Sequence, residues 1–358
     1  MSIPHYHLSI DKKGMKKLKK DKWSDQLVPA VLQVDQTNYE VKTTYRGAHT
    51  RKFKKKSYMV EFNDTNLFHQ QKTLHLNAEF NDYSLLRSKL SFNLFHKLNV
   101  LTPKAEHIML THNNLFSSIY LKLDSIDEFY LNNHNLPDGP IFYAQNDDAN
   151  FSLLRPDDYK PKKSLLDGYM RKYGLESDDH SVEILLYKIN TLSQDKFITE
   201  INNLIDVEKY LSWLIGVVCT QNFDAFIQNY ALYQNRETNR FEVIPWDYDA
   251  TWGRDINGRI MEHDYIPISG YNTLTARLLA CTTFRTRYRL KLEQTIETFF
   301  TTKELEKEIN ELHQILRPYA INDTFLKNKL SYFDSEPEFI LQYIRDRVNF
   351  IKKELTDF

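Results

Sequence analysis

Glycine is scarce in this chain, which contains only nine among 358 residues. No two glycines have the spacing of the dinucleotide fingerprint GxGxxG, and no GxxxxGK[ST] phosphate loop occurs. The glycine-rich loop of ordinary protein kinases is missing as well. If a protein with this sequence binds a nucleotide, side chains must hold much of the phosphate charge in place of bare backbone amides.

Cysteine is scarcer still, with Cys219 and Cys281 as the only two. Two cysteines make neither a disulfide framework nor a zinc pattern, and His5 and His7 add too few ligands for zinc. The N-terminus lacks the apolar stretch of a signal peptide, and the apolar run LSWLIGVVC is too short to span a bilayer. We therefore expect an intracellular protein without a membrane partner.

The chain has no excess of charge of one sign, because it contains 47 Lys and Arg residues and 48 Asp and Glu residues. Net charge therefore predicts no nucleic-acid partner. The basic residues are unevenly distributed, since DKKGMKKLKKDK (11–22) and RGAHTRKFKKK (46–56) are both strongly basic. Such runs are most often a solvated face, and otherwise form a surface for phosphate or for an acidic partner.

The apolar pattern divides the chain into two parts. Before about residue 147, segments rich in β-branched and aromatic residues alternate with period two, which predicts strands. From residue 148 onward the period is helical, except for one predicted hairpin at 229–234 and 240–249. We expect an α+β protein with a sheet-rich domain at 1–147 and a mainly helical domain at 148–358. This arrangement resembles the two lobes of a protein kinase.

Three helix starts are predicted from capping signals. One helix is expected at 82–99, capped by Asp82 or Ser84. A shorter helix is expected after Ser125. The last helix is expected to begin at Glu336–Pro337, because proline is favoured in the first helical turn.

Two clusters of Asp and Asn flank the predicted hairpin. NFDAFIQN carries Asp224 and, five residues later, Asn229, while PWDYD carries Asp247 and Asp249 after the returning strand. In phosphoryl transfer one carboxylate accepts the proton of the attacking hydroxyl, and an amide and a second carboxylate hold Mg²⁺. The order and the loop length match the catalytic loop and the metal-binding Asp of kinases, although the usual flanking His, Arg and Gly are absent.

The alternative interpretation is that Asp224 and Asp249 are turn or cap residues, which Asp commonly is. A calcium-binding loop in DYDATWGRDING is excluded. Trp252 occupies the position that needs Gly, and Gly258 occupies the position that needs Glu.

The basic segment FKKKSYMVEF offers the phosphate-binding half of such a site. Strand alternation places Lys56 on the face of the apolar residues and predicts that it points inward, with Lys55 as its rival. Arg46, just upstream, is expected to fold over a nucleotide, and Glu79 is the candidate carboxylate partner of the lysine. The alternative is an exposed basic edge strand.

Four stretches resemble the spore coat protein H family, the CotH kinases: RGAHTRKFKKKSYMVEF, LHLNAEFNDYSLLRSKLSFNLF, NFDAFIQNYALY and FEVIPWDYDATWGRD. The resemblance implies an atypical Ser/Thr protein kinase that uses ATP with Mg²⁺ or Mn²⁺. Its substrates would be Ser-rich, basic spore coat proteins, phosphorylated during coat assembly. Its location would be the mother-cell cytoplasm and then the spore coat.

Carried over by motif, the resemblance makes Asp224 the catalytic residue and Asn229 and Asp247 metal ligands. Asp249 joins the metal residues, and Trp246 flanks the nucleotide. Two other functions remain open: a kinase-shaped coat assembly protein without catalysis, and a phosphotransferase that acts on a small molecule or transfers AMP.

Overall fold

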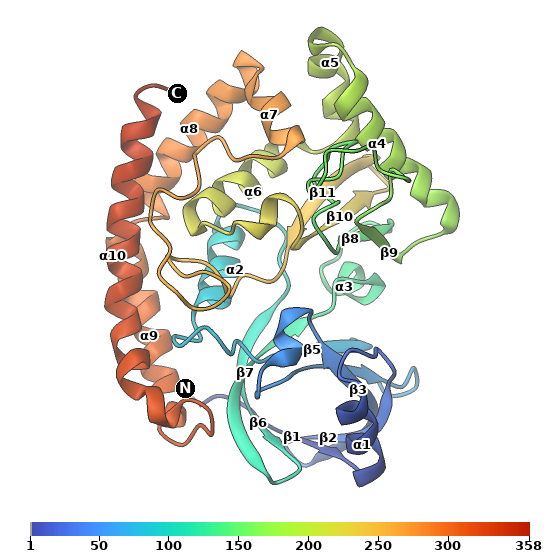
Figure 1. Ribbon diagram of the computed structural model, residues 1–358, viewed down its shortest axis with the longest axis vertical. Coiled ribbons are helices and arrows are strands. Elements are labelled where there is room, and N and C mark those ends of the chain that lie inside the picture. Colours follow the sequence, from blue (N-terminus) through green and yellow to red (C-terminus); the bar gives the residue numbers. More distant parts are fainter. Residues whose placement is uncertain (1) are drawn as a thin grey trace.

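The computed structural model describes residues 2–358, with a barrel of strands at one end and helices at the other (Figure 1). This bears out the predicted α+β class, with a sheet-rich N-terminal region and a helical C-terminal region. None of the helices within residues 2–358 is both long and apolar enough to cross a bilayer.

Seven strands close the barrel in the order β1-β2-β3-β4-β5-β7-β6. Its only parallel pair in the described chain joins β1 to β6, with His5 opposite Met109. Alternate residues point into the barrel, among them Leu8, Leu32 and Val60, which have no exposed surface. The strands are β1 (His5–Ile10), β2 (Val28–Val34), β3 (Thr37–Arg46), β4 (Ser57–Phe62), β5 (Thr73–Asn77), β6 (Ala105–His112) and β7 (Phe116–Asp124).

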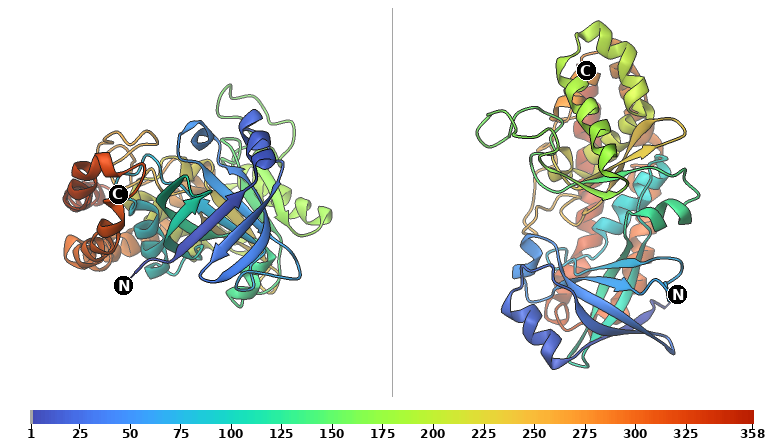
Figure 2. Two further views of the ribbon diagram at one scale, coloured as in Figure 1. Left: turned by 90° about the horizontal axis from the view of Figure 1, so that it is seen from below. Right: turned by 90° about the vertical axis from the view of Figure 1, so that its right-hand side faces the viewer.

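A second sheet has the order β11-β10-β8-β9. Its strands are β8 (Ile141–Ala144), β9 (Tyr169–Tyr173), β10 (Tyr230–Asn235) and β11 (Arg240–Pro245). β10 and β11 are the predicted hairpin. β8 lies before residue 147 and pairs with β10, which lies after it. The predicted domain boundary between residues 147 and 148 stays a prediction. The segment between β8 and β9 projects from the body as a long loop (Figure 2).

The helices are, in chain order, α1 (Lys12–Lys20), α2 (Arg87–Lys97), α3 (Glu128–Asn133), α4 (Asp179–Thr191), α5 (Gln194–Leu204), α6 (Val207–Thr220), α7 (Thr273–Leu279), α8 (Thr282–Thr298), α9 (Thr302–Ala320) and α10 (Leu330–Leu355). The residues of α6 are nearly all buried, and this helix packs against α2, α8 and β11. Short 3-10 turns add η1 (His49–Lys52), η2 (Glu176–Asp178), η3 (Asp224–Phe226) and η4 (Lys327–Lys329).

Two predicted caps are wrong. α2 begins at Arg87 and not near Asp82, because Leu85 has a φ of 58°, which no α-helix contains. Asp82 still serves the helix start, since its Oδ2 accepts from the Arg87 backbone N–H at 3.0 Å. α3 is capped by Asp127, whose carboxylate accepts from Phe129 N–H at 3.0 Å, and not by Ser125.

The start of the last helix is also earlier than predicted. α10 begins at Leu330, so Pro337 lies inside the helix. A proline there removes one backbone hydrogen bond. The helix continues because Phe333, Ile340 and Ile344 bury an apolar stripe against the neighbouring helices.

Candidate active site

The end of α6 sets the position of Asp224. Gln221 ends the helix with a φ of 56°, and the Asn222 side chain then accepts from Ala225 N–H of η3 at 3.1 Å. Asp224 is the first residue of η3, and its backbone carbonyl accepts from Gln228 N–H at 2.8 Å. Asp224 is half-buried and lies on a tightly hydrogen-bonded turn.

The hairpin brings the second acidic cluster to the same place. Tyr230 is paired with Pro245, and beyond them Trp246 N–H donates to the Asn229 carbonyl at 3.1 Å. The side-chain amides of Asn222 and Asn229 both donate to the carbonyl of Asp247, at 3.1 and 3.5 Å. The two clusters that are separated in sequence thus share one set of hydrogen bonds.

The backbone at this place is unusual. Glu79, Asn229 and Asp247 have φ angles of 46°, 59° and 63°. Positive φ is uncommon for residues other than glycine, and such conformations cluster at functional sites because the surrounding structure must hold them. Three residues that the sequence predicts for the site therefore share this feature.

Carboxylates are crowded around Asp247. Burial raises the pKa of Asp247, while the nearby Arg46 opposes the rise. Burial raises the pKa of Asp249 well above its usual range, and the charges of Glu79 and Asp247 add to the effect. Burial likewise raises the pKa of Glu79 to about 7, against a hydrogen bond of 2.7 Å from the Ser88 hydroxyl. The group lacks enough positive charge to keep all three ionised.

Arg46 is the basic residue whose charge lowers the pKa of Asp247. It lies at the end of β3, and its guanidinium donates to the side-chain oxygen of Asn77. Burial lowers its pKa, whereas Asp247 and Glu79 raise it. Arg46 therefore lies near Asp247 and Glu79, and these two lie near Asp249. The roles predicted for these residues stay predictions.

The two lysines are placed differently from the sequence interpretation. β4 begins at Ser57, so strand alternation does not extend to Lys56. Lys55 is the buried lysine: its ammonium donates to the Ile119 carbonyl at 2.5 Å and lies 4.5 Å from the Tyr120 ring centre. Lys56, only half-buried, donates to the backbone carbonyls of Arg51 and Phe53.

Burial also lowers the pKa of Lys55 to about 8, with Asp323 and Glu79 opposing. Glu79 thus influences Lys55 electrostatically. Among residues 2–358, however, it forms no ion pair with Lys55 or Lys56. Contact of either lysine with phosphate stays a prediction.

Trp246 supplies an aromatic wall beside the carboxylates. Its ring centre lies 5.7 Å from that of Tyr143, with the two planes tilted by 30°. Its buried Nε1 has no hydrogen-bond partner in the described part of the chain. A buried donor without an acceptor is rare, and it fits a site that receives a polar ligand such as a nucleotide.

The donor chemistry of the site fits Mg²⁺, which prefers carboxylate and amide oxygens. Asp247, Asp249 and Asn229 are such donors. Within residues 2–358 no set of three or more His, Cys, Asp or Glu side chains is arranged to enclose a metal ion. Mg²⁺ is usually held by one or two carboxylates together with the phosphates of a nucleotide.

Exposed aromatic rings lie beside Asp224. The ring centre of Phe223 is 5.1 Å from that of Tyr271 and 5.7 Å from that of Tyr265. The Tyr271 hydroxyl donates to the Phe223 carbonyl, and the charges of Asp224 and Asp147 help burial to raise the Tyr271 pKa. An aromatic surface with acidic neighbours suits a cationic side chain.

Asn222 and Asn77 are site residues that the sequence interpretation missed. Asn222 connects the Asp224 turn to Asp247, and Asn77 accepts a hydrogen bond from Arg46. Asn222 has a local signal, since an Asn next to a helix end and two residues before Asp is typical of a turn whose side chain caps the backbone. Asn77 has none, because its partner lies 31 residues away.

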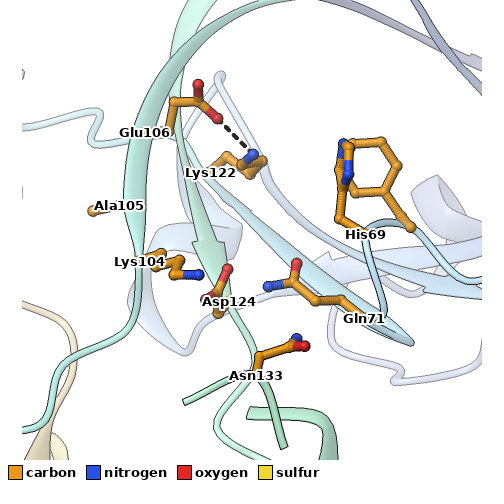
Figure 3. A pocket seen from close by; sticks show the side chains of 9 residues that line it. His69, Gln71, Lys104, Ala105, Glu106, Lys122, Asp124 and Asn133 are labelled. Atoms are coloured by element: carbon orange, nitrogen blue, oxygen red, sulfur yellow. Dashed lines mark ion pairs between the residues drawn. The ribbon is translucent and has the colours of Figure 1, made fainter. Parts of the chain in front are cut away.

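A separate pocket of about 460 Å³ opens at one end of the barrel (Figure 3). Its walls include Lys104, Glu106, Lys122 and Asp124, and Lys122 pairs with Glu106 at 2.6 Å. Its lining contains none of the described residues that the sequence predicted for the site. Because the charges in it are balanced, we do not assign the phosphate chemistry to this pocket.

Comparison with solved structures finds only loose likeness. The HipA, HipB and operator DNA complex of Shewanella oneidensis MR-1 matches with a TM-score of 0.42 and 10% identity, over 98% of this chain and 74% of that chain. The Helicobacter pylori proinflammatory kinase CtkA matches with a TM-score of 0.31 and 10% identity, over 92% of each chain.

Curated sequences match far more closely. Inner spore coat protein H of Bacillus subtilis (strain 168) is 45% identical over 355 residues, which are 99% of this chain and 98% of that protein. An inner spore coat protein H-like protein of the same organism is 26% identical over 299 residues, 80% of this chain and 81% of that protein. The family model described as CotH kinase protein matches residues 43–351, and the chain therefore belongs to that family.

Proposed function

We propose that this protein is an atypical Ser/Thr protein kinase that transfers the γ-phosphate of ATP to spore coat proteins during coat assembly. The observation that carries the proposal is the pair of hydrogen bonds from Asn222 and Asn229 to the Asp247 carbonyl. They hold the Asp224 turn against the segment that carries Asp247. A proton acceptor and a metal-binding carboxylate beside each other are what phosphoryl transfer requires.

In the proposed mechanism, Asp224 orients a substrate Ser or Thr hydroxyl and accepts its proton as the oxygen attacks the γ-phosphorus. The bond between the γ-phosphorus and the bridging oxygen breaks, and ADP leaves. Arg46 contacts the phosphate oxygens, and Lys55, the buried lysine of the basic segment, is the second candidate for this contact. Trp246 flanks the nucleotide with its ring. A Mg²⁺ or Mn²⁺ ion held by Asn229 and Asp247, with Asp249 close by, would supply charge neutralisation on the phosphates.

The surroundings of Asp224 support basic substrates. Phe223, Tyr265 and Tyr271 expose aromatic faces, and Asp147 lies close enough to influence Tyr271. Lys or Arg residues that flank a substrate Ser would bind both the rings and the acidic side chains. Ser-rich, basic coat proteins fit this surface, and the mother-cell cytoplasm and then the coat would be where the protein meets them.

Asp224→Asn and Asp247→Asn test the proposal. We expect each to lower phosphate transfer from labelled ATP to a Ser-rich basic protein by about 100-fold or more, since each removes a group that acts in the reaction. Asp195→Asn, at an exposed position of α5, is the matched control and should keep full activity. Unchanged transfer in the first two variants would show that the site is assigned wrongly. Mass spectrometry of the product separates phosphate from AMP transfer.

A coat assembly protein without catalysis is the second candidate. It is favoured by the absence, among the described residues, of an ion pair between Glu79 and Lys55. Such a protein would show no rise in melting temperature with ATP and Mg²⁺, whereas a ligand that binds the folded state must raise it. A rise that EDTA abolishes would exclude a degenerate nucleotide pocket, and phosphate transfer that Asp224→Asn abolishes would exclude a protein without catalysis.

A further inference from the structure

A groove of about 620 Å³ lies on the barrel where α1 meets the turn between β6 and β7. Figure 1 shows α1 at the end of the barrel that lies away from α6 and the β10–β11 hairpin, so the groove is separate from the candidate active site. One wall is α1 itself. The other is formed by Asn113 and Leu115 of the turn, with Ile10 of β1 between them.

Unpaired lysines form the rim of this groove. α1 contains six lysines and no acidic residue, and all six are exposed. None of them forms an ion pair within residues 2–358. Their positions divide them: Lys12, Lys16, Lys19 and Lys20 line the groove, whereas Lys13 and Lys17 do not. Spacings of three and four residues place the lining lysines on one face of the helix.

The groove also contains apolar side chains, and hydrogen bonds fix the backbone segments that carry them. Leu115 is 75% exposed, and Met15 is half-buried beside it. The turn is fixed because the Asn113 side chain accepts from Ile10 N–H at 2.7 Å. The helix is fixed because Asp11 caps it, accepting from Gly14 N–H at 2.6 Å. A preformed groove of this kind binds a ligand with little loss of conformational entropy.

Two common partners of basic surfaces do not fit. Helices that lie on membranes expose a broad apolar face, whereas the apolar face of α1, Gly14 and Leu18, is already buried against the barrel. Surfaces that bind single-stranded nucleic acid combine positive charge with stacking aromatic rings, and the described lining of the groove contains no aromatic ring and no arginine.

We propose that this lysine groove docks an acidic segment of a partner protein, in which Asp or Glu side chains flank an apolar one. The carboxylates would meet Lys12, Lys16, Lys19 and Lys20, and the apolar side chain would cover Leu115 and Met15. Opposite charge steers such an encounter, and the buried apolar contact slows dissociation. The groove is a binding surface in its own right and does not depend on the proposed phosphate transfer.

The test is fluorescence anisotropy with a labelled peptide of repeated Glu-Glu-Leu, added to the full chain. We expect binding that weakens as salt is raised, because screening shields exposed charges. Lys16→Glu/Lys20→Glu should weaken it by about tenfold or more, since each reversed charge removes an attraction and adds a repulsion. Lys13→Glu/Lys17→Glu changes the net charge equally on the same helix and should stay within about twofold of the original affinity.

A further variant, Leu115→Asn, tests the apolar contact in the groove and should weaken binding by about threefold or more. Equal loss of affinity in the two double variants would overturn the proposal, because it would show attraction to net charge alone. Binding of only a phosphoserine peptide, or of only phosphatidylserine vesicles, would overturn it as well. So would light scattering that shows self-association through the groove without peptide binding. Circular dichroism checks that each variant is folded.

Discussion

Glu79, Asp247 and Asp249 are held in an environment that disfavours their ionised forms. Burial is the largest cause of the raised pKa of each, and their mutual repulsion adds to the effect. Arg46 is a single cation against three carboxylates. Such a group of buried carboxylates lowers the stability of the folded protein, and the binding of positively charged ligands would restore it.

The contribution of Glu79 to the stability of the ligand-free protein should therefore fall as pH rises from about 4.5 to above 7. Glu79 has a folded-state pKa of about 7 against an ordinary value of 4.5. Between these values the folded state binds more protons than the unfolded state, so raising the pH favours unfolding. Urea unfolding across this range measures the loss. Glu79→Gln should make it smaller, whereas Glu297→Gln at an exposed position of α8 should leave it unchanged.

At the scale of elements, the packing of α6 against α2 determines where the Asp224 turn lies. Gly216 of α6 faces Phe95 of α2, and a Cβ atom at Gly216 would lie only 2.2 Å from a carbon of the Phe95 ring. Phe95 has no exposed surface and little room to move. The glycine therefore sets the distance between the two helices.

Gly216→Ala should destabilise the protein by about 1–3 kcal/mol, as overpacking of a close-packed core does. In an unconstrained helix the same change would stabilise by about 1 kcal/mol, so the sign of the effect distinguishes the two cases. Thermal and urea unfolding measure it. Combining it with Phe95→Leu should recover part of the loss. A neutral or stabilising Gly216→Ala would mean that the helices can separate without cost.

At the scale of the whole molecule, a buried ion cluster joins distant parts of the chain. Arg87, fully buried at the start of α2, pairs with Asp82 and with Glu336 of α10, both at 2.5 Å. Its Nε also donates to the Thr251 carbonyl at 2.9 Å, just beyond the hairpin. Arg254 adds a second pair with Glu336 at 2.6 Å. The cluster connects the segment after β5, the segment after β11 and α10.

Arg87→Met should cost roughly 3–5 kcal/mol, because removing one partner leaves buried carboxylates uncompensated. Arg289→Met is the comparison, since Arg289 forms an exposed pair with Glu293 at 2.9 Å and should cost less than about 1 kcal/mol. The free energy of unfolding in urea gives both values. Equal effects from the two substitutions would contradict a structural role for the buried cluster.

The sequence by itself determined most of the strands and helices and the order of the acidic motifs, although α1 and β9 were not predicted. Period-two alternation and helical periodicity depend only on which face of an element is buried, and β2 to β8 and the β10–β11 hairpin follow them. It also predicts that Asp224, Asn229, Asp247 and Asp249 form a group, because their spacing around one hairpin is a local property.

Only the tertiary structure decided how these residues meet. The burial of Lys55 and not Lys56, the positive φ of Leu85 and the contact of Asn222 with Asp247 all depend on packing between segments far apart in the chain. The sequence predicts Asp82 or Ser84 as a cap, whereas the structure places Asp82 in an ion pair with Arg87. Contacts between side chains that are far apart in the sequence result from the packing of many elements, and no local sequence pattern predicts them.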